Sequence, residues 1–346
     1  ALLHLGVAYM RLGDYAKQRD VLERALPIYE REYGSDGAEV ADVLTNLGNA
    51  YMYHGDYAKQ RNLLERALAI KERAYGRDHA QVANVLNNLG NACGFLGDHA
   101  KKRDVLERAL AIMERTYGRD HPNVATTLTN LGDAHNQLGD YAKARDVLER
   151  SLVIQERAYG RDHPNVAQTL TNLGLAYGYL GDQAKKRDML ERVLAIQERE
   201  YSRDHVEVAN TLTNLGDAYR VLGDNAKARD VLEHALAINK RAYGHDHTSV
   251  AATLTNLGAA YGNLGDSAKE RDMLERALAI NKRAYGHDHP EVALSLFNLA
   301  MLSGSLGDIP KARELLERVL PIWTRAYGTD HRRTKMCQKR LAKLAS

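Results

Sequence analysis

Apolar residues recur along the chain with a period of 42 residues. The pair Leu131-Gly132 is repeated, with no insertion between copies, at Leu5-Gly6, Leu47-Gly48, Leu89-Gly90, Leu173-Gly174, Leu215-Gly216 and Leu257-Gly258, and Leu299-Ala300 is an eighth, degenerate copy. A fixed period of this length is typical of solenoids, in which one supersecondary unit stacks on copies of itself. The pattern therefore predicts one elongated repeat domain.

Within one repeat, the apolar spacing predicts two helices. Leu128 and Leu131 belong to an apolar face with the three-and-four spacing of a helix, and this first helix, A, is expected to end near Gly139. Asp140 is expected to cap a second helix, B, which ends at Gly160. Two antiparallel helices cannot bury both apolar faces alone, so each pair must stack on its neighbours. The predicted fold class is all-α.

The order Leu-Gly, Ala-Tyr, Gly-Asp and Ala-Leu resembles the tetratricopeptide repeat, as in Leu215, Gly216, Ala218, Tyr219, Gly223, Asp224, Ala235 and Leu236. The usual repeat of that family has about 34 residues. The longer helix B and the Tyr-Gly-x-Asp-His-Pro junction found here are similar to kinesin light chains and related bacterial regulatory proteins. The resemblance implies a right-handed α-solenoid superhelix whose concave wall, lined by the A helices, binds peptide segments of other proteins.

We expect a single solenoid over residues 1–346 with eight helix pairs and a C-terminal capping helix. The expected repeats are 1–36, 37–78, 79–120, 121–162, 163–204, 205–246, 247–288 and 289–330, and the cap is 331–346. The chain begins inside the first Leu-Gly helix and without Met, so we expect a fragment or a processed product whose flanking domains are missing.

Composition and charge narrow the functional classes. Apolar residues make up 44% of the chain, yet no apolar run approaches the roughly 20 residues of a membrane span, and no signal peptide is evident. The distant pair Cys93 and Cys337 gives no disulfide framework, so a reducing, cytoplasmic location is expected. The net charge of the chain is +3, but six Lys or Arg lie in residues 331–346, so the net charge of residues 1–330 is −3. The repeats therefore lack the basic stripe expected of a nucleic-acid-binding solenoid. An anionic lipid or nucleic-acid contact by the basic cap remains an alternative.

One asparagine precedes the leucine of each A helix from the second repeat onward, and these form the expected peptide-binding ladder: Asn46, Asn88, Asn130, Asn172, Asn214, Asn256 and Asn298. The resemblance implies that this position faces the ligand, and an amide can both donate to and accept from a peptide backbone. The alternative is that these amides form hydrogen bonds within the stack.

Neighbouring A-helix positions are expected to supply specificity: Asn49, Tyr53, Asn91, Phe95, Asp133, Asn136, Tyr179, Asp217 and Arg220. A clamp for a C-terminal carboxylate would place Lys and Arg on these positions, whereas most are uncharged or acidic. Asp133 and Asp217 favour a partner segment with basic residues, although single carboxylates in a groove are often merely solvated.

The loop between repeats carries an Asp-His pair, as in Asp162-His163, and Asp162 is expected to be the N-cap of the next A helix. The runs His245-Asp246-His247 and His287-Asp288-His289 also suggest a metal or acid–base interpretation. One such group per 42 residues, however, could form a closed ligand set only across several repeats. We therefore expect capping, with no metal, no cofactor, no catalytic residue and no enzyme activity.

These observations predict a protein–protein interaction scaffold that binds a peptide in a groove lined by the A helices. Two alternatives remain. Near-identical repeats could stack end to end as a self-assembling structural solenoid. The chain could also be the sensor or regulatory module of a larger protein whose effector domain lies outside this sequence.

Overall fold

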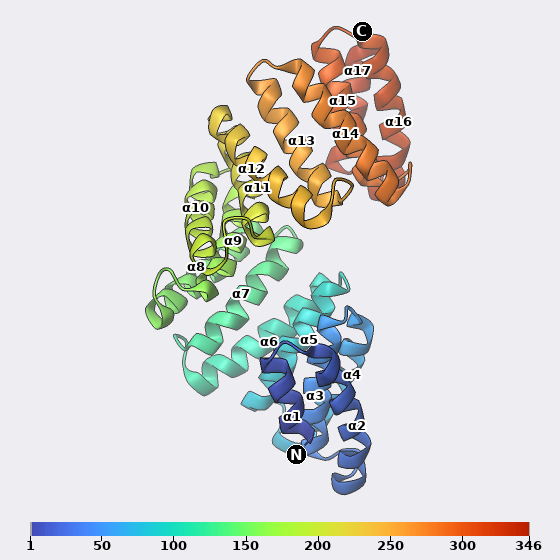
Figure 1. Cartoon of the computed structure of the whole chain (residues 1–346). Coiled ribbons are helices and arrows are strands. Elements are labelled where there is room, and N and C mark those ends of the chain that lie inside the picture. Colours follow the sequence, from blue (N-terminus) through green and yellow to red (C-terminus); the bar gives the residue numbers. More distant parts are fainter. Residues whose placement is uncertain (1, 346) are drawn as a thin grey trace. The chain divides into compact units, whose positions relative to one another are not determined.

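The computed structural model describes residues 2–345, and the described residues form seventeen helices and no strand (Figure 1). The A helices are α1 (Leu2–Arg11), α3 (Ala38–Tyr53), α5 (Ala80–Phe95), α7 (Pro122–Gln137), α9 (Pro164–Tyr179), α11 (Val206–Val221), α13 (Thr248–Asn263) and α15 (Pro290–Ser305). The B helices are α2 (Tyr15–Tyr33), α4 (Tyr57–Tyr75), α6 (His99–Tyr117), α8 (Tyr141–Tyr159), α10 (Gln183–Glu200), α12 (Asn225–Tyr243), α14 (Ser267–Tyr285) and α16 (Ile309–Tyr327). Helix α17 (Arg332–Ala345) follows them, so the predicted all-α fold of eight helix pairs and a final helix is confirmed.

The chain divides into two compact units, one up to Asp182 and one from Gln183 onward. Helices α1 to α9 belong to the first unit and α10 to α17 to the second. Within each unit every helix packs on the next one along the chain, and the A helices of neighbouring repeats also contact each other, as α7 contacts α9 and α11 contacts α13. We call the surface that these A helices share the A-helix face.

The turn between helices A and B follows the glycine and aspartate pattern. Gly139 has a φ of 80°, a left-handed conformation that glycine adopts without strain, and Asp140 is the N-cap of α8. In most repeats the aspartate side chain accepts a hydrogen bond from the backbone amide of the third helical residue, as Asp56 does from the Lys59 amide at 3.0 Å. Asp140 makes no such bond, and its carboxylate lies 3.6 Å from Nδ1 of His135.

The junction between repeats corrects the prediction for Asp162. The N-cap of α9 is His163, whose Nδ1 accepts a hydrogen bond from the Asn165 amide at 3.1 Å, and whose ring stacks on Tyr159. The same arrangement recurs at the other Asp-His junctions. The junction aspartate instead contacts the following B helix, as Asp78 does Arg115 at 3.1 Å. Histidine, and not aspartate, is the N-cap because its ring can both accept the capping hydrogen bond and stack on the preceding tyrosine.

Apolar cores run across repeat boundaries within each unit. In the first unit, Leu86, Ile112 and Leu128 belong to one buried cluster although they come from α5, α6 and α7. In the second unit, Leu341 and Leu344 of α17 pack on a cluster that includes Trp323 of α16. Helix α17 therefore covers the last repeat, as the prediction of a capping helix requires.

Buried polar links between repeats were not predicted from the sequence. A side-chain amide on one B helix contacts a hydroxyl on the next A helix in four successive places: Gln155 with Thr169, Gln197 with Thr211, Asn239 with Thr253, and Asn281 with Ser295, at 2.6 to 3.1 Å. Such bonds satisfy polar groups that would otherwise be costly to bury. The 42-residue spacing of these four amides was the signal that could have revealed them.

Candidate functional site

A cavity of about 420 Å³ opens on the A-helix face of the first unit. We call it the first-unit cavity; its lining residues are Met52, Asn91, Gly94, Phe95, His99, Lys102, Asn130, Asp133, Gln137 and Gln168. Four of them, Asn91, Phe95, Asn130 and Asp133, are residues that the sequence analysis selected. They come from α5 and α7, so stacking the repeats brings positions far apart in the sequence to one opening.

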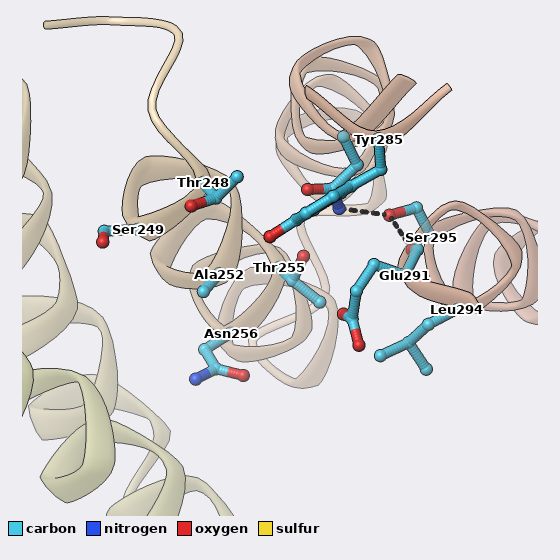
Figure 2. Close-up of a pocket in the computed structure, with 10 residues that line it drawn as sticks. Thr248, Ser249, Ala252, Thr255, Asn256, Tyr285, Glu291, Leu294 and Ser295 are labelled. Carbon is cyan, nitrogen blue, oxygen red and sulfur yellow. Dashed lines mark hydrogen bonds between the residues drawn. The ribbon is translucent and has the colours of Figure 1, made fainter. Parts of the chain in front are cut away.

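A second cavity, of about 400 Å³, lies between α13 and α15 in the second unit (Figure 2). Figure 2 shows the Tyr285 side chain extending toward α13, the helix that carries Thr248, Ala252 and Thr255. Asn281 donates to the Ser295 hydroxyl at 3.0 Å, so the buried link between repeats also lines this cavity. Asn256, one of the predicted ladder residues, also lines this cavity.

The asparagine ladder has no uniform environment. Asn130 lines the first-unit cavity, whereas the Asn46 side chain donates to the carbonyl of Asp42 in its own helix at 2.8 Å. Asn172 keeps its side-chain nitrogen buried without a hydrogen-bond partner among the described residues. Asn88, Asn256 and Asn298 are half-buried and Asn214 is exposed. Contact of this ladder with a peptide stays a prediction.

The two acidic residues predicted to supply specificity, Asp133 and Asp217, both have cationic partners in this chain. Lys102 donates to Asp133, and Lys186 donates to Asp217 at 2.7 Å. Arg220 also reaches Asp217 at 2.7 Å. Burial alone would raise the pKa of Asp217, but the hydrogen bonds and charges of Lys186 and Arg220 outweigh it and lower that pKa. A basic side chain from a partner would have to displace these cations.

Glycines on the A helices make room for these lysines. A Cβ at Gly94 would lie 2.9 Å from Cδ of Lys102, so glycine leaves room for this side chain to cross α5 toward α7, and alanine would force it to shift. Repeat four reverses the arrangement, with Ala144 on the B helix and Asn136 on the A helix. There the buried Asn136 donates across the repeat boundary to the carbonyl of Asn172 at 2.9 Å. The alternation between repeats therefore changes which helix supplies the polar group.

Aromatic residues at the ends of three A helices stay exposed although they stack. Tyr53, Phe95 and Tyr179 are 51%, 55% and 64% exposed, and each stacks on a tyrosine that begins the B helix of the preceding repeat. Stacking fixes one ring face and leaves apolar surface on the A-helix face. A partner could bury that surface. The remaining predicted residue, Asn49, is half-buried on α3.

The described part of the chain offers few groups for other chemistry. Residues 2–345 contain no group of three or more His, Cys, Asp or Glu that could hold a metal ion. No described helix is both long and apolar enough to span a bilayer. The cysteines, Cys93 and Cys337, are free and buried, and burial raises the pKa of Cys337 to about 11, which keeps this thiol protonated and unreactive.

Paired antiparallel helices with a 42-residue period define an α-solenoid repeat protein. The chain belongs to the tetratricopeptide-repeat family. Family models described as tetratricopeptide repeat match residues 1–72, 40–101, 82–123, 103–156, 134–199, 187–240, 207–283 and 271–322. The fold and family are those of protein-interaction scaffolds.

Solved structures support the kinesin-light-chain type of repeat. A point variant of the Podosopora anserina kinesin-light-chain-type protein with nearly identical TPR-like repeats is 27% identical, covering 60% of this chain and 97% of its own, with a TM-score of 0.51. BtubC (BKLC) from P. vanneervenii is 23% identical; the match covers 66% of this chain and 92% of BtubC, with a TM-score of 0.56. The quorum sensor NprR from B. thuringiensis shares the fold at 13% identity; the match covers 100% of this chain and 98% of NprR, with a TM-score of 0.65. A search of curated protein sequences found no match.

Proposed function

We propose that this chain binds a peptide segment of a partner protein on its A-helix face and acts as a scaffold without enzyme activity. The first-unit cavity is the observation that carries the proposal, because it collects amide, aromatic and charged side chains from successive A helices in one opening. Tetratricopeptide-repeat proteins are generally scaffolds of this kind.

The lining of the first-unit cavity suits an extended peptide. Asn91, Asn130 and Gln168 carry amides that can pair with a peptide backbone without reading its sequence. Phe95 offers an exposed apolar face for a side chain. When an extended peptide is bound, hydrogen bonds to its backbone give affinity and pockets for its side chains give specificity.

The whole asparagine ladder remains part of the proposal, with different roles for its members. Asn46 already donates one N–H of its amide to its own helix, so it can offer a peptide its oxygen and one remaining N–H. The side-chain nitrogen of Asn172 is buried and has no hydrogen-bond partner among the described residues, so a rotation of this side chain would let it donate to a peptide backbone. Asn130 and Asn172 are therefore the pair on which to test the ladder.

The test compares retention of lysate proteins by the wild type and by Asn130→Ala with Asn172→Ala. We expect the variant to lose at least one retained protein while its melting temperature stays close to that of the wild type. Asn123→Ala with Asn165→Ala is the matched control, because it makes the same change at exposed positions in the first turns of the same two helices. Equal retention by all three proteins would contradict peptide binding by the ladder.

A single solenoid over residues 1–346 and a cytoplasmic location complete the proposal. Two free, buried cysteines suit a reducing compartment. Self-assembly is the less favoured alternative, because α17 already covers the apolar end of the last repeat. Light scattering over a range of concentrations distinguishes the two, since only self-assembly makes the mass depend on concentration.

A further inference from the structure

Glu270 occupies in repeat seven the place that Lys102 occupies in repeat three. Both residues lie in the first turn of a B helix and cross a glycine of their own A helix. A Cβ at Gly94 would meet Lys102, and a Cβ at Gly262 would collide with the Glu270 carboxylate. Lys102 lines the first-unit cavity, so the equivalent position of Glu270 is on the A-helix face of the second unit.

The two positions differ in what they meet on the next A helix. Lys102 donates to Asp133, and Lys186 of repeat five donates to Asp217 in the same manner. The residue that corresponds to these aspartates in repeat eight is Met301, which offers no charge. The Glu270 side chain has no hydrogen bond or ion pair with any described residue. Repeat seven therefore presents a carboxylate where repeats three and five contain a closed ion pair.

The position of this carboxylate is unfavourable for the free protein. Glu270 is half-buried, and the loss of water raises the pKa of its carboxyl group above the usual 4.5. No cation in the described chain offsets this cost. An unpaired, partly desolvated charge on a binding face is a candidate for ligand recognition.

We propose that Glu270 binds the basic side chain, Lys or Arg, of a peptide held along the A helices of the second unit. The inference rests on the proposed function and adds to it the chemistry of one ligand position. The chain supplies its own precedent, because Lys102 in the first unit and Lys186 in the second each reach an aspartate on the following A helix. One carboxylate fits one cationic side chain, whereas a metal ion would need further ligands, and the described residues offer no such set.

A random library of 12-residue peptides displayed on phage tests this proposal. Selection on the immobilised wild type should enrich Lys or Arg at one position. A synthetic peptide from that selection should bind Glu270→Gln about tenfold more weakly, as expected when a charge-assisted hydrogen bond of about 1.5 kcal/mol is lost. Glu275→Gln is the matched control, because it makes the same change at an exposed site on the same helix, and should bind like the wild type.

Charge reversal sharpens the test. Glu270→Lys should fold, because repeats three and five already carry lysine at this position and glycine at the matching position of helix A. It should select acidic residues where the wild type selects basic ones. Glu270→Gln should melt at the same or a higher temperature than the wild type, because it removes a charge that burial penalises, so weaker binding could not be attributed to unfolding.

The outcomes separate the two proposals. Peptides selected without any basic preference, or bound equally by wild type and Glu270→Gln, would overturn the role of Glu270 and leave peptide binding intact. If the wild type selects no peptide at all, the proposed function fails and the role of Glu270 fails with it.

Discussion

Glycines on the A helices are packing residues at the scale of the single side chain. Gly90 faces Leu106, and a Cβ built on Gly90 would lie 2.8 Å from Cγ of that leucine. A glycine inside a helix costs about 1 kcal/mol relative to alanine. Close approach of the B helix offsets this cost where a buried side chain fills the space that alanine would occupy.

Gly90→Ala should therefore destabilise the protein by about 1–3 kcal/mol, the usual range for overpacking a core. Urea unfolding of the two proteins measures the difference. Gly304→Ala is the control on another A helix, since its Cβ would have only Ala312 nearby, at 3.8 Å. That variant should be stabilised by about 0.4–1 kcal/mol, because alanine reduces the entropy of the unfolded chain. A loss of stability in Gly304→Ala equal to that in Gly90→Ala would contradict the packing argument.

The charged residues of the A-helix face were the least predictable from the sequence. The positions of Asp133 and Asp217 followed from the helical register, but their partners did not. Lys102 precedes Asp133 by 31 residues and reaches it across Gly94, which leaves room for the lysine side chain. Pairing of this kind depends on three helices at once, whereas periodicity describes one helix at a time.

At the scale of the element, local sequence signals predict the C-terminal ends of the helices better than their N-caps. The glycines that end the helices were predictable, because a left-handed residue after a helix strongly favours glycine, as at Gly160 with a φ of 94°. The N-cap of α9 was placed one residue too early, at Asp162 instead of His163. Aspartate is the commoner cap. Only the stacked tyrosine, here Tyr159, shows that the histidine ring is already oriented for the role.

His247→Ala tests this assignment in the second unit. His247 accepts from the Ser249 amide at 3.2 Å and stacks on Tyr243 with ring centres 4.3 Å apart. Losing the cap should cost about 0.5–2 kcal/mol in thermal or urea unfolding. His245→Ala is the control from the same loop, and it should change stability little because His245 is exposed and caps no helix. Equal losses would assign the effect to the loop and not to the cap.

At the scale of the whole molecule, stability comes from contacts between neighbouring repeats. Clusters such as that of Leu86, Ile112 and Leu128 belong to no single repeat, so an end without a neighbour would expose apolar surface. The period alone predicted this stacking, because it repeats the same apolar faces. The buried amide–hydroxyl hydrogen bonds, such as that between Gln197 and Thr211, could not be predicted from a single repeat. Their prediction requires knowing which residues of neighbouring repeats face each other.

Helix α17 covers the apolar end of the second unit, and its removal should cause the chain to self-associate through that end. Cys337 is fully buried in the cluster that contains Trp323, and Leu341 packs against the same cluster. A chain ending at His331 would expose these apolar surfaces, and two such ends would bury them against each other. Light scattering should then give a mass that rises with protein concentration, unlike that of the full chain.

The basic charge of α17 requires a separate control. Lys335→Ala with Lys339→Ala removes two exposed cations and keeps the apolar contacts of the helix. This variant should scatter like the full chain, because burial of Cys337 and Leu341 defines the cap while the lysines only solvate its outer side. A concentration-dependent mass for the lysine variant, with a constant mass for the shortened chain, would show that charge and not coverage prevents association, and would favour a role for the basic residues beyond capping.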